Sequence, residues 1–342
     1  MLRIAVAQFN ATVGDLTGNV ERIIACAAAA KARGAQVLLT PELALCGYPP
    51  EDLLLRPDFY RACSRALDDL ARRIEESAPG LAAVVGHPEE HAGRRFNAAT
   101  VIENGQKKAV YRKMRLPNYE VFDEKRYFEA GSEACVVMLG GVRFGINICA
   151  DIWEAGAAEL SREAGAELLL VLNASPCHLE KHQQRAQVLG ERIAATGIPA
   201  IYANLVGGQD ELVFDGASFA LDAHGSCRMR LPSFEEALGI VDFDHNRLHS
   251  EQLAEELQVE AEAYRALVLG VRDYIGKSGF KGAIIGLSGG IDSALTLCVA
   301  VDALGADKVH AVMMPSPYTA QMSLDDSREM IRKLGVRYDE IA

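Results

Sequence analysis

The chain has 342 residues, a length typical of about two domains. Hydrophobic residues make up 49% of it and charged residues 24%, a globular balance that excludes an intrinsically disordered chain. The formal net charge is −12, and a negative surface repels the phosphate backbone of nucleic acids. We therefore expect no nucleic-acid partner.

The cysteines and the N-terminus indicate a compartment. Eight cysteines are scattered along the chain without a Cys-x-x-Cys pair, so they predict neither a disulfide scaffold nor a zinc site, and a reducing cytosol is the simplest interpretation. The first residues lead directly into a strand pattern without a signal-peptide core. The longest charge-free run, residues 193–209, is too short and too polar to cross a bilayer. These patterns predict a cytoplasmic protein with no membrane partner.

Short β-rich runs alternate with helical stretches in the first part of the chain. Strands are predicted at residues 4–9, 37–39, 82–86, 168–172, 198–203, 214–221 and 238–243, and helices at 20–33, 61–77 and 181–195. Asn19 is the candidate N-cap of the first helix and Gly34 its candidate stop.

Two hairpins interrupt this alternation. Residues 98–102 and 106–111 flank an Asn104-Gly105 turn, and residues 136–139 and 142–148 flank Gly140-Gly141. A plain doubly wound parallel sheet would need fewer hairpins. The pattern predicts an α/β layered sandwich with mixed sheets.

The pattern changes near Asp244. A long, charge-rich helical stretch is predicted over residues 251–275, followed by a strand at 283–286, a helix at 293–304, a strand at 309–314 and a helix at 323–334. This order predicts the start of a parallel α/β domain. We expect one domain over 1–243, a helical connector over 244–262 and the N-terminal part of a second domain, incomplete here, over 263–342.

Three chemically reactive residues follow predicted strands, where catalytic groups of α/β folds collect. Glu42, Lys113 and Cys149 stand at these strand ends. A carboxylate can take the proton of a thiol, and an ammonium group can stabilise a developing oxyanion. Taken singly, each residue is more often a packing or surface group. Together they predict acyl transfer through a thioester.

The sequence segments that contain these residues resemble those of a known family. The segments TPELALCGYPPEDLL, YRKMRLPNYEVFDEKRYF and INICADIWE occur in this order. Residues 1–243 resemble the nitrilase superfamily, which implies an α-β-β-α sandwich with Glu42 as general base, Lys113 as oxyanion stabiliser and Cys149 as nucleophile. Glu120 is the candidate for a second glutamate that many members keep near the lysine and the cysteine.

Within the superfamily, the sequence of these segments is most similar to that of the glutaminase domains of glutamine-dependent NAD synthetases. That resemblance implies a glutamine site, to which Tyr119, Ser175 and Lys181 contribute. It also implies a homo-oligomer, and a glutaminase half that needs no cofactor.

A glycine-rich loop follows the first strand of the second domain. Its residues are Gly286, Leu287, Ser288, Gly289, Gly290, Ile291, Asp292 and Ser293. Backbone N–H groups and a helix N-terminus there suit a phosphate, but the lysine of a Walker A loop is missing. Ser-Gly-Gly-x-Asp-Ser instead resembles the ATP pyrophosphatase signature. The resemblance implies an adenine-nucleotide α-hydrolase-like parallel sheet that binds ATP, with Asp292 placing Mg²⁺, and residues 313–319 suit an adenine pocket.

Both resemblances imply one reaction, in which ammonia from glutamine amidates adenylated deamido-NAD while ATP is cleaved to AMP and pyrophosphate. Two alternatives stay open. The chain could be a stand-alone amidase of the nitrilase superfamily with a vestigial nucleotide-binding segment, although the intact loop argues against it. It could also be a non-catalytic nucleotide-binding or assembly module, although the complete Glu42, Lys113 and Cys149 set argues against that.

Overall fold

The computed structural model describes residues 1–119 and 121–342. Contacts divide the described chain into two compact units. Unit 1 comprises residues 1–207 and 214–257, and unit 2 comprises residues 208–213 and 258–342.

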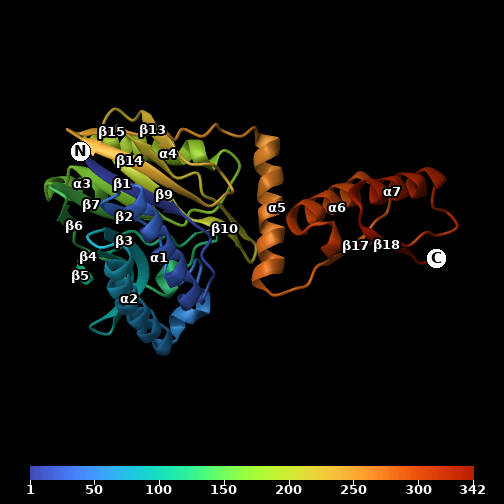
Figure 1. Cartoon of the computed structure of the whole chain (residues 1–342), viewed down its shortest axis with the longest axis horizontal. Coiled ribbons are helices and arrows are strands. Elements are labelled where there is room, and N and C mark those ends of the chain that lie inside the picture. The colour runs from blue at the N-terminus through green and yellow to red at the C-terminus, as the bar shows by residue number, and fades with distance from the viewer. Residues whose placement is uncertain (120) are drawn as a thin grey trace. The chain divides into compact units, whose positions relative to one another are not determined.

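Unit 1 contains two mixed β-sheets packed face to face (Figure 1). In spatial order, the first sheet runs β15 (Arg247–His249), β14 (Ala237–Asp244), β1 (Leu2–Gln8), β2 (Val37–Leu39), β3 (Ala82–His91), β4 (Arg94–Glu103) and β5 (Gln106–Arg112). The second runs β13 (Cys227–Arg230), β12 (Phe219–Leu221), β9 (Ala200–Asn204), β8 (Leu168–Asn173), β7 (Val142–Ile148) and β6 (Cys135–Leu139). The central strands are parallel and the outer ones antiparallel, so the predicted mixed sheets are confirmed.

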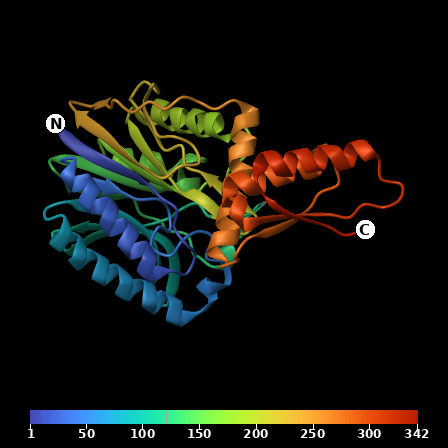
Figure 2. The same cartoon turned by 45° about the vertical axis from the view of Figure 1, so that its right-hand side comes forward.

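Helices cover the outer faces of both sheets. On the first sheet α1 (Leu16–Ala32) and α2 (Pro57–Ser77) lie side by side in both ribbon views (Figure 2). On the second sheet lie α3 (Ala157–Glu163) and α4 (Lys181–Thr196). The short 3₁₀ helices of unit 1 are η1 (Glu51–Leu55), η2 (Glu124–Arg126) and η3 (Cys149–Ile152). A small hairpin is formed by β10 (Val206–Gln209) and β11 (Leu212–Asp215), and its residues 208–213 belong to unit 2. The result is the four-layer α-β-β-α sandwich expected from the sequence.

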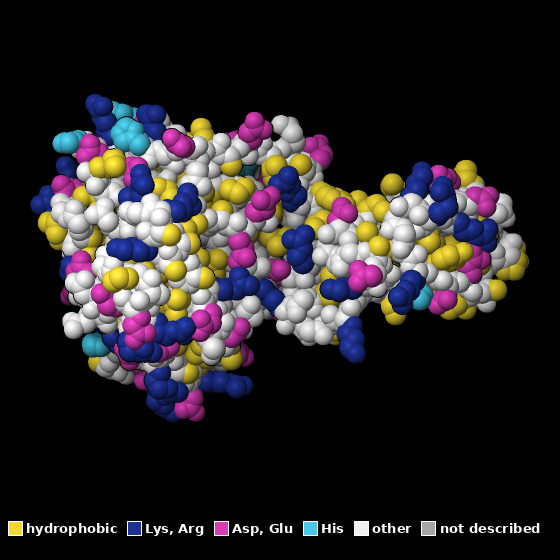
Figure 3. Space-filling view, viewed as in Figure 1, with side chains coloured by type: hydrophobic (Ala, Val, Ile, Leu, Met, Phe, Trp, Pro, Cys, Tyr) yellow, Lys and Arg dark blue, Asp and Glu magenta, His cyan; other side chains and the backbone are white. Residues whose placement is uncertain are grey.

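The core lies between the sheets because both inner faces are apolar. Alternating residues of β1, β7 and β8, such as Ile4, Ile146 and Leu170, are fully buried in one cluster. On the surface of unit 1, acidic and basic side chains are interspersed over the visible face (Figure 3). In the described part of the chain, no helix is both long and apolar enough to span a membrane.

Unit 2 has a parallel three-stranded sheet in the order β16 (Ala283–Gly286), β17 (Val309–Met313) and β18 (Arg337–Glu340). Its helices are α5 (Val259–Lys277), α6 (Ile291–Leu304) and α7 (Gln321–Leu334), with the 3₁₀ turn η4 (Ala306–Lys308). Leu297, Val309 and Ile331 pack in its apolar core. The predicted strand–helix alternation is confirmed.

Two details of unit 1 differ from the sequence-based prediction. Helix α1 begins at Leu16 because the Asp15 side chain, not Asn19, caps it by accepting the Gly18 N–H at 2.8 Å. Asn19 is buried within the helix and donates to the Thr12 and Leu45 carbonyls. The strand predicted over 214–221 is broken at Gly216, where the φ of +68° turns the backbone around the Gln8 side chain.

The helical connector predicted over 244–262 is wrong in its secondary structure, since β15 lies inside it and α5 begins only at Val259. The physical reason is a set of tertiary hydrogen bonds. The Gln252 carbonyl accepts from Arg230 N at 2.9 Å, and the Gln252 side chain accepts from Ile240 N at 2.7 Å. These bonds hold the segment extended along the sheet edges, against its helical propensity.

Gly86 of β3 is a position where packing leaves no room for a side chain. A Cβ there would lie 2.5 Å from the Pro41 carbonyl oxygen and 2.6 Å from Leu43 N, both backbone atoms. We expect Gly86→Ala to lower the free energy of unfolding by about 1–3 kcal/mol, measured by urea denaturation. Gly190 of α4, with nothing near its Cβ position, is the matched control, and Gly190→Ala should be stabilising by about 0.5–1 kcal/mol. Equal effects of the two substitutions would contradict this account.

Candidate active site

The three residues singled out in the sequence stand at strand ends, as predicted. Glu42 follows β2, Lys113 follows β5 directly, and Cys149 follows β7 directly as the first residue of η3. The first two come from one sheet and the third from the other. All three side chains are buried.

A charged hydrogen bond joins Glu42 to Lys113. Lys113 Nζ donates to Glu42 Oε1 at 2.7 Å, and both side chains are at most 1% exposed. Asn97 Nδ2 donates to the same carboxylate oxygen at 2.7 Å, while Ala174 N donates to Oε2 at 3.0 Å. The Glu42 carboxylate is therefore held on both of its oxygens.

Glu124 is a functional candidate that the sequence-based prediction missed. Its Oε1 accepts from Lys113 Nζ at 2.8 Å and from the Tyr48 hydroxyl at 3.3 Å. Its Oε2 is buried and has no hydrogen-bond partner among the described residues. In the sequence Glu124 sits between other charged residues, a pattern typical of solvated surface. Glu120, the candidate for this second glutamate, lies outside the described residues.

Burial and neighbouring charges set the protonation states of this cluster. Burial raises the pKa of Glu124 to about 7, although Lys113 opposes that shift. Burial alone would lower the pKa of Lys113, but the carboxylates of Glu124 and Glu42 outweigh it and raise that pKa well above its usual range. Lys113 is therefore an ammonium group at neutral pH.

Cys149 occupies a strained turn at the end of β7. Its φ is +42°, a left-handed conformation that is rare for a residue other than glycine, and its side chain is 6% exposed. Burial, followed by the charge of Glu42, raises the pKa of the Cys149 thiol, and Lys113 lowers it less. The resting thiol keeps its proton, so it needs a base before it can act as a nucleophile.

Ser175 is linked to this cluster through its backbone. It follows Ala174, whose N–H holds Glu42, and it is 4% exposed. Tyr119 is 57% exposed and stacks edge-on against Phe122. Lys181 lies at the start of α4 with Nζ 4.4 Å from the centre of the Trp153 ring. The structure thus ties Ser175 to the Glu42 network through the neighbouring Ala174 backbone.

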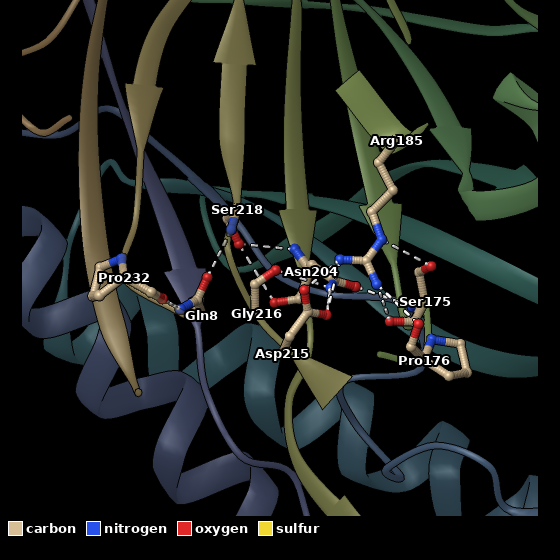
Figure 4. Close-up of polar contacts among 9 residues, drawn as sticks. All are labelled: Gln8, Ser175, Pro176, Arg185, Asn204, Asp215, Gly216, Ser218 and Pro232. Carbon is tan, nitrogen blue, oxygen red and sulfur yellow. Dashed lines mark hydrogen bonds and ion pairs between the residues drawn. The ribbon is translucent and has the colours of Figure 1, made fainter. Parts of the chain in front are cut away.

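A buried ion pair fixes the Ser175 segment (Figure 4). Arg185 of α4 donates to both carboxylate oxygens of Asp215 at 2.7 and 2.8 Å. The same guanidinium donates to Ser175 Oγ at 3.1 Å and to the carbonyls of Ser175 and Pro176. Ser175 N donates to Asn204 Oδ1 at 3.0 Å. Hydrogen bonds to Arg185 and Asn204 therefore fix the backbone and the side chain of Ser175, the residue after Ala174.

The glycine-rich loop of unit 2 has the predicted strand–loop–helix context. It joins β16 to α6, and Gly289 has a φ of +85°. A Cβ on Gly289 would lie 2.5 Å from the Ser323 carbonyl oxygen, so glycine is required there. Ser293 Oγ accepts from Ser288 N and donates to the Gly290 carbonyl, which keeps the turn tight.

Several polar residues of this loop are exposed to solvent. Ser288, Gly290 and Asp292 are exposed, and Asp292 lies in the first turn of α6. No cluster of three or more His, Cys, Asp or Glu side chains that could hold a metal occurs in the described ranges. Asp292 is therefore a single exposed carboxylate and not part of such a cluster. Beyond β17, residues 316–319 form a turn closed by Ser316 N donating to Thr319 Oγ1.

Comparison with known proteins matches both units. The carbon-nitrogen hydrolase family matches residues 3–250 and the NAD synthase family matches residues 263–342. A glutamine-dependent NAD(+) synthetase of Xylella fastidiosa is 47% identical over all of this chain, and one of Acinetobacter baylyi is 43% identical over 98% of it. The chain spans 63% and 62% of the lengths of these two relatives.

Among solved structures, one matches nearly the whole chain and another matches about 71% of it. The glutamine-dependent NAD+ synthetase of Acinetobacter baumannii, in complex with ADP, matches 99% of this chain with a TM-score of 0.94 and 41% identity, and the match covers 64% of that protein. An amidase of Nesterenkonia sp. AN1 matches 71% of this chain and 90% of its own, with a TM-score of 0.63 and 30% identity. The nitrilase-like sandwich and the parallel-sheet synthetase portion are thereby confirmed. The chain belongs to the carbon-nitrogen hydrolase family, and its residues 263–342 match the NAD synthase family.

Proposed function

We propose that this chain acts in glutamine-dependent NAD synthesis. Unit 1 hydrolyses glutamine, and the ammonia amidates adenylated deamido-NAD at a synthetase site to which unit 2 contributes, with ATP cleaved to AMP and pyrophosphate. The observation that carries the proposal is the buried Glu42–Lys113–Glu124 cluster around Cys149, on the same chain as the glycine-rich loop. The names of the similar proteins support it.

The buried cluster suits thioester chemistry. Glu42 takes the Cys149 proton while the sulfur attacks the side-chain amide carbon of glutamine. Lys113 stabilises the negative charge that develops on the amide oxygen. Glu42 then returns the proton to the leaving nitrogen, which departs as ammonia. Glu42 deprotonates a water that attacks the thioester carbon, and it then gives this proton to the Cys149 sulfur as the C–S bond breaks and glutamate leaves.

The surrounding residues supply position and specificity in this proposal. Glu124 and Glu42 each form an ion pair with the Lys113 ammonium group, and these two ion pairs fix the position of its positive charge. Tyr119, Ser175 and Lys181 contact the glutamine substrate. The Arg185–Asp215 pair keeps Ser175 in place for that contact.

The loop of unit 2 fits a triphosphate. Gly289 and Gly290 have no side chains that would screen the backbone, and Gly290 N donates to the exposed Ser288 hydroxyl at 3.3 Å. The Ser288 and Ser293 hydroxyls and the α6 N-terminus favour an anion. Exposed Asp292 would hold Mg²⁺, whose charge would offset that of the phosphates. ATP is the proposed ligand. A homo-oligomer and a cytoplasmic location stay predictions.

The similar amidase structure favours one alternative, a chain that hydrolyses simple amides. Initial rates with glutamine and with acetamide or propionamide separate the two functions. The proposed function predicts a kcat/KM for glutamine at least about 100-fold higher, since binding of the whole substrate contributes to catalysis. A preference for the aliphatic amides would favour the amidase.

Replacing the nucleophile should abolish the first reaction. Cys149→Ala is expected to lower kcat for glutamate release from glutamine by at least about 1,000-fold, because no thioester can form. Cys26→Ala on α1, at a half-buried cysteine outside the cluster, is the matched control and should keep kcat within about twofold. Undiminished hydrolysis by Cys149→Ala would rule out the proposed mechanism.

Glu124 predicts a pH dependence of stability. Its pKa is raised to about 7 in the folded chain, so its contribution to stability is present below the ordinary pKa of about 4.3 and is lost as the pH rises through about 7. The free energy of unfolding of the wild type, relative to Glu124→Gln, should therefore fall between about pH 5 and pH 8. Urea unfolding at several pH values measures this difference. Exposed Glu133→Gln is the control, and a difference for Glu124→Gln that rises with pH would contradict the prediction.

Asp292 separates the two sites. Asp292→Asn should weaken MgATP binding about tenfold, measured by calorimetry, and leave kcat/KM for glutamine hydrolysis within about twofold. Asp307→Asn, an exposed carboxylate beyond the other end of α6, is the control. Equal loss of both activities in Asp292→Asn would contradict the division into two sites, and unchanged MgATP binding would contradict the assignment of Asp292.

A further inference from the structure

Asp151 is a fully buried carboxylate that the proposed reaction does not use. It lies in η3, two residues after Cys149, and its exposure is 0%. A buried carboxylate is costly unless hydrogen bonds compensate it. The partners of Asp151 therefore indicate why an acid is kept at this position.

The two oxygens of Asp151 bind the two segments that carry Lys113 and Cys149. Oδ1 accepts from Met114 N at 3.0 Å and from Arg115 N at 2.8 Å, the two residues that follow Lys113. Oδ2 accepts from Ile148 N at 2.9 Å, the residue before Cys149. Oδ2 also accepts from the buried Tyr111 hydroxyl at 2.7 Å. One carboxylate thus joins the end of β5 to the end of β7.

The hydrogen bonds that Asp151 accepts lie next to a strained stretch of backbone at Cys149. Cys149 holds a φ of +42°, a conformation that persists only when the surrounding structure imposes it. The bond from Ile148 N to Asp151 closes the turn on both sides of Cys149, and the bonds to Met114 and Arg115 fix that turn relative to Lys113. A misplacement of about 1 Å between reacting groups can cost about 100-fold in rate.

We propose that Asp151, supported by Tyr111, is a positioning residue that sets the distance and orientation of the Cys149 thiol relative to Lys113 and Glu42. It contacts neither substrate nor reacting atoms. The role rests on the proposed glutamine hydrolysis, but its geometric part is independent of the substrate. Four donors on one side chain require a carboxylate, because the amide of asparagine keeps a single acceptor oxygen and presents donors on its other side.

The test compares Asp151→Asn with a matched control in the full chain. Asp222 is also a mostly buried carboxylate that accepts two backbone N–H groups, from His224 and Ser226, and a side-chain bond from Arg228. It lies in the turn between β12 and β13. Asp222→Asn should lower the melting temperature and leave the kinetics unchanged.

For Asp151→Asn we expect kcat for glutamine hydrolysis to fall about 10- to 100-fold while KM stays within about twofold, measured well below the melting temperature. We also expect slower alkylation of Cys149 by iodoacetamide, followed at that peptide by mass spectrometry, since the thiol loses its alignment with Glu42. Unchanged kcat and alkylation, or changes no larger than in Asp222→Asn, would overturn the inference.

Two further arms keep the test decisive. If Asp151→Asn does not fold, Tyr111→Phe removes one of the four donors, and a severalfold fall in kcat and in alkylation at constant KM is expected; no change in either would overturn the inference. If the wild type releases no glutamate from glutamine, the proposed function fails. The alkylation rates of the same variants then still decide the role of Asp151.

Discussion

The Lys113 ammonium group, buried between two carboxylates, is the constraint on which the site depends. A lone charge in this interior would be prohibitively unstable, so Glu42 and Glu124 must both approach it, at 2.7 and 2.8 Å. Burial raises the pKa of Glu124, and the neighbouring Glu42 carboxylate adds to that rise while Lys113 opposes it. Burial, followed by the charge of Glu42, also raises the pKa of the Cys149 thiol. The cluster therefore holds a protonated thiol, and in the proposed function Glu42 is the group that accepts its proton.

The sandwich makes this cluster possible because its reactive groups come from the ends of strands in two sheets. Glu42 and Lys113 leave one sheet, and Cys149 leaves the other. Packing of the inner faces excludes water and strengthens each electrostatic contact. Gly86 shows how close the approach is, since its missing side chain leaves room for the backbone on both sides of Glu42.

The candidate sites of the two units differ in how their polar groups are arranged. In the proposed function, unit 1 uses buried, mutually compensated charges to activate a thiol. Unit 2 exposes a loop of glycines and serines at a helix N-terminus, where backbone N–H groups favour an anion. The first arrangement needs a complete core around it, whereas the second depends on a few adjacent residues.

That difference explains how much could be predicted from the sequence. The strand–loop–helix of unit 2 and the strand-end positions of Glu42, Lys113 and Cys149 were predicted because each depends on local residue order, and the structure confirms these placements. Most strands and helices of unit 1 were also found within a few residues. Family resemblance supplied the roles, which stay proposals.

Tertiary structure decided what no local pattern could show. Glu124 sits in a run of charged residues and was missed, because its burial depends on Lys113 arriving from β5. Asp151 gains its four donors from segments that are far apart in the chain. Asn19 was taken for a helix cap and is buried, and residues 251–258 are extended because Gln252 binds Arg230 and Ile240. By itself the sequence determined the elements and the reactive residue types. Folding decided which polar groups lose water together, because desolvation is a property of the packed chain.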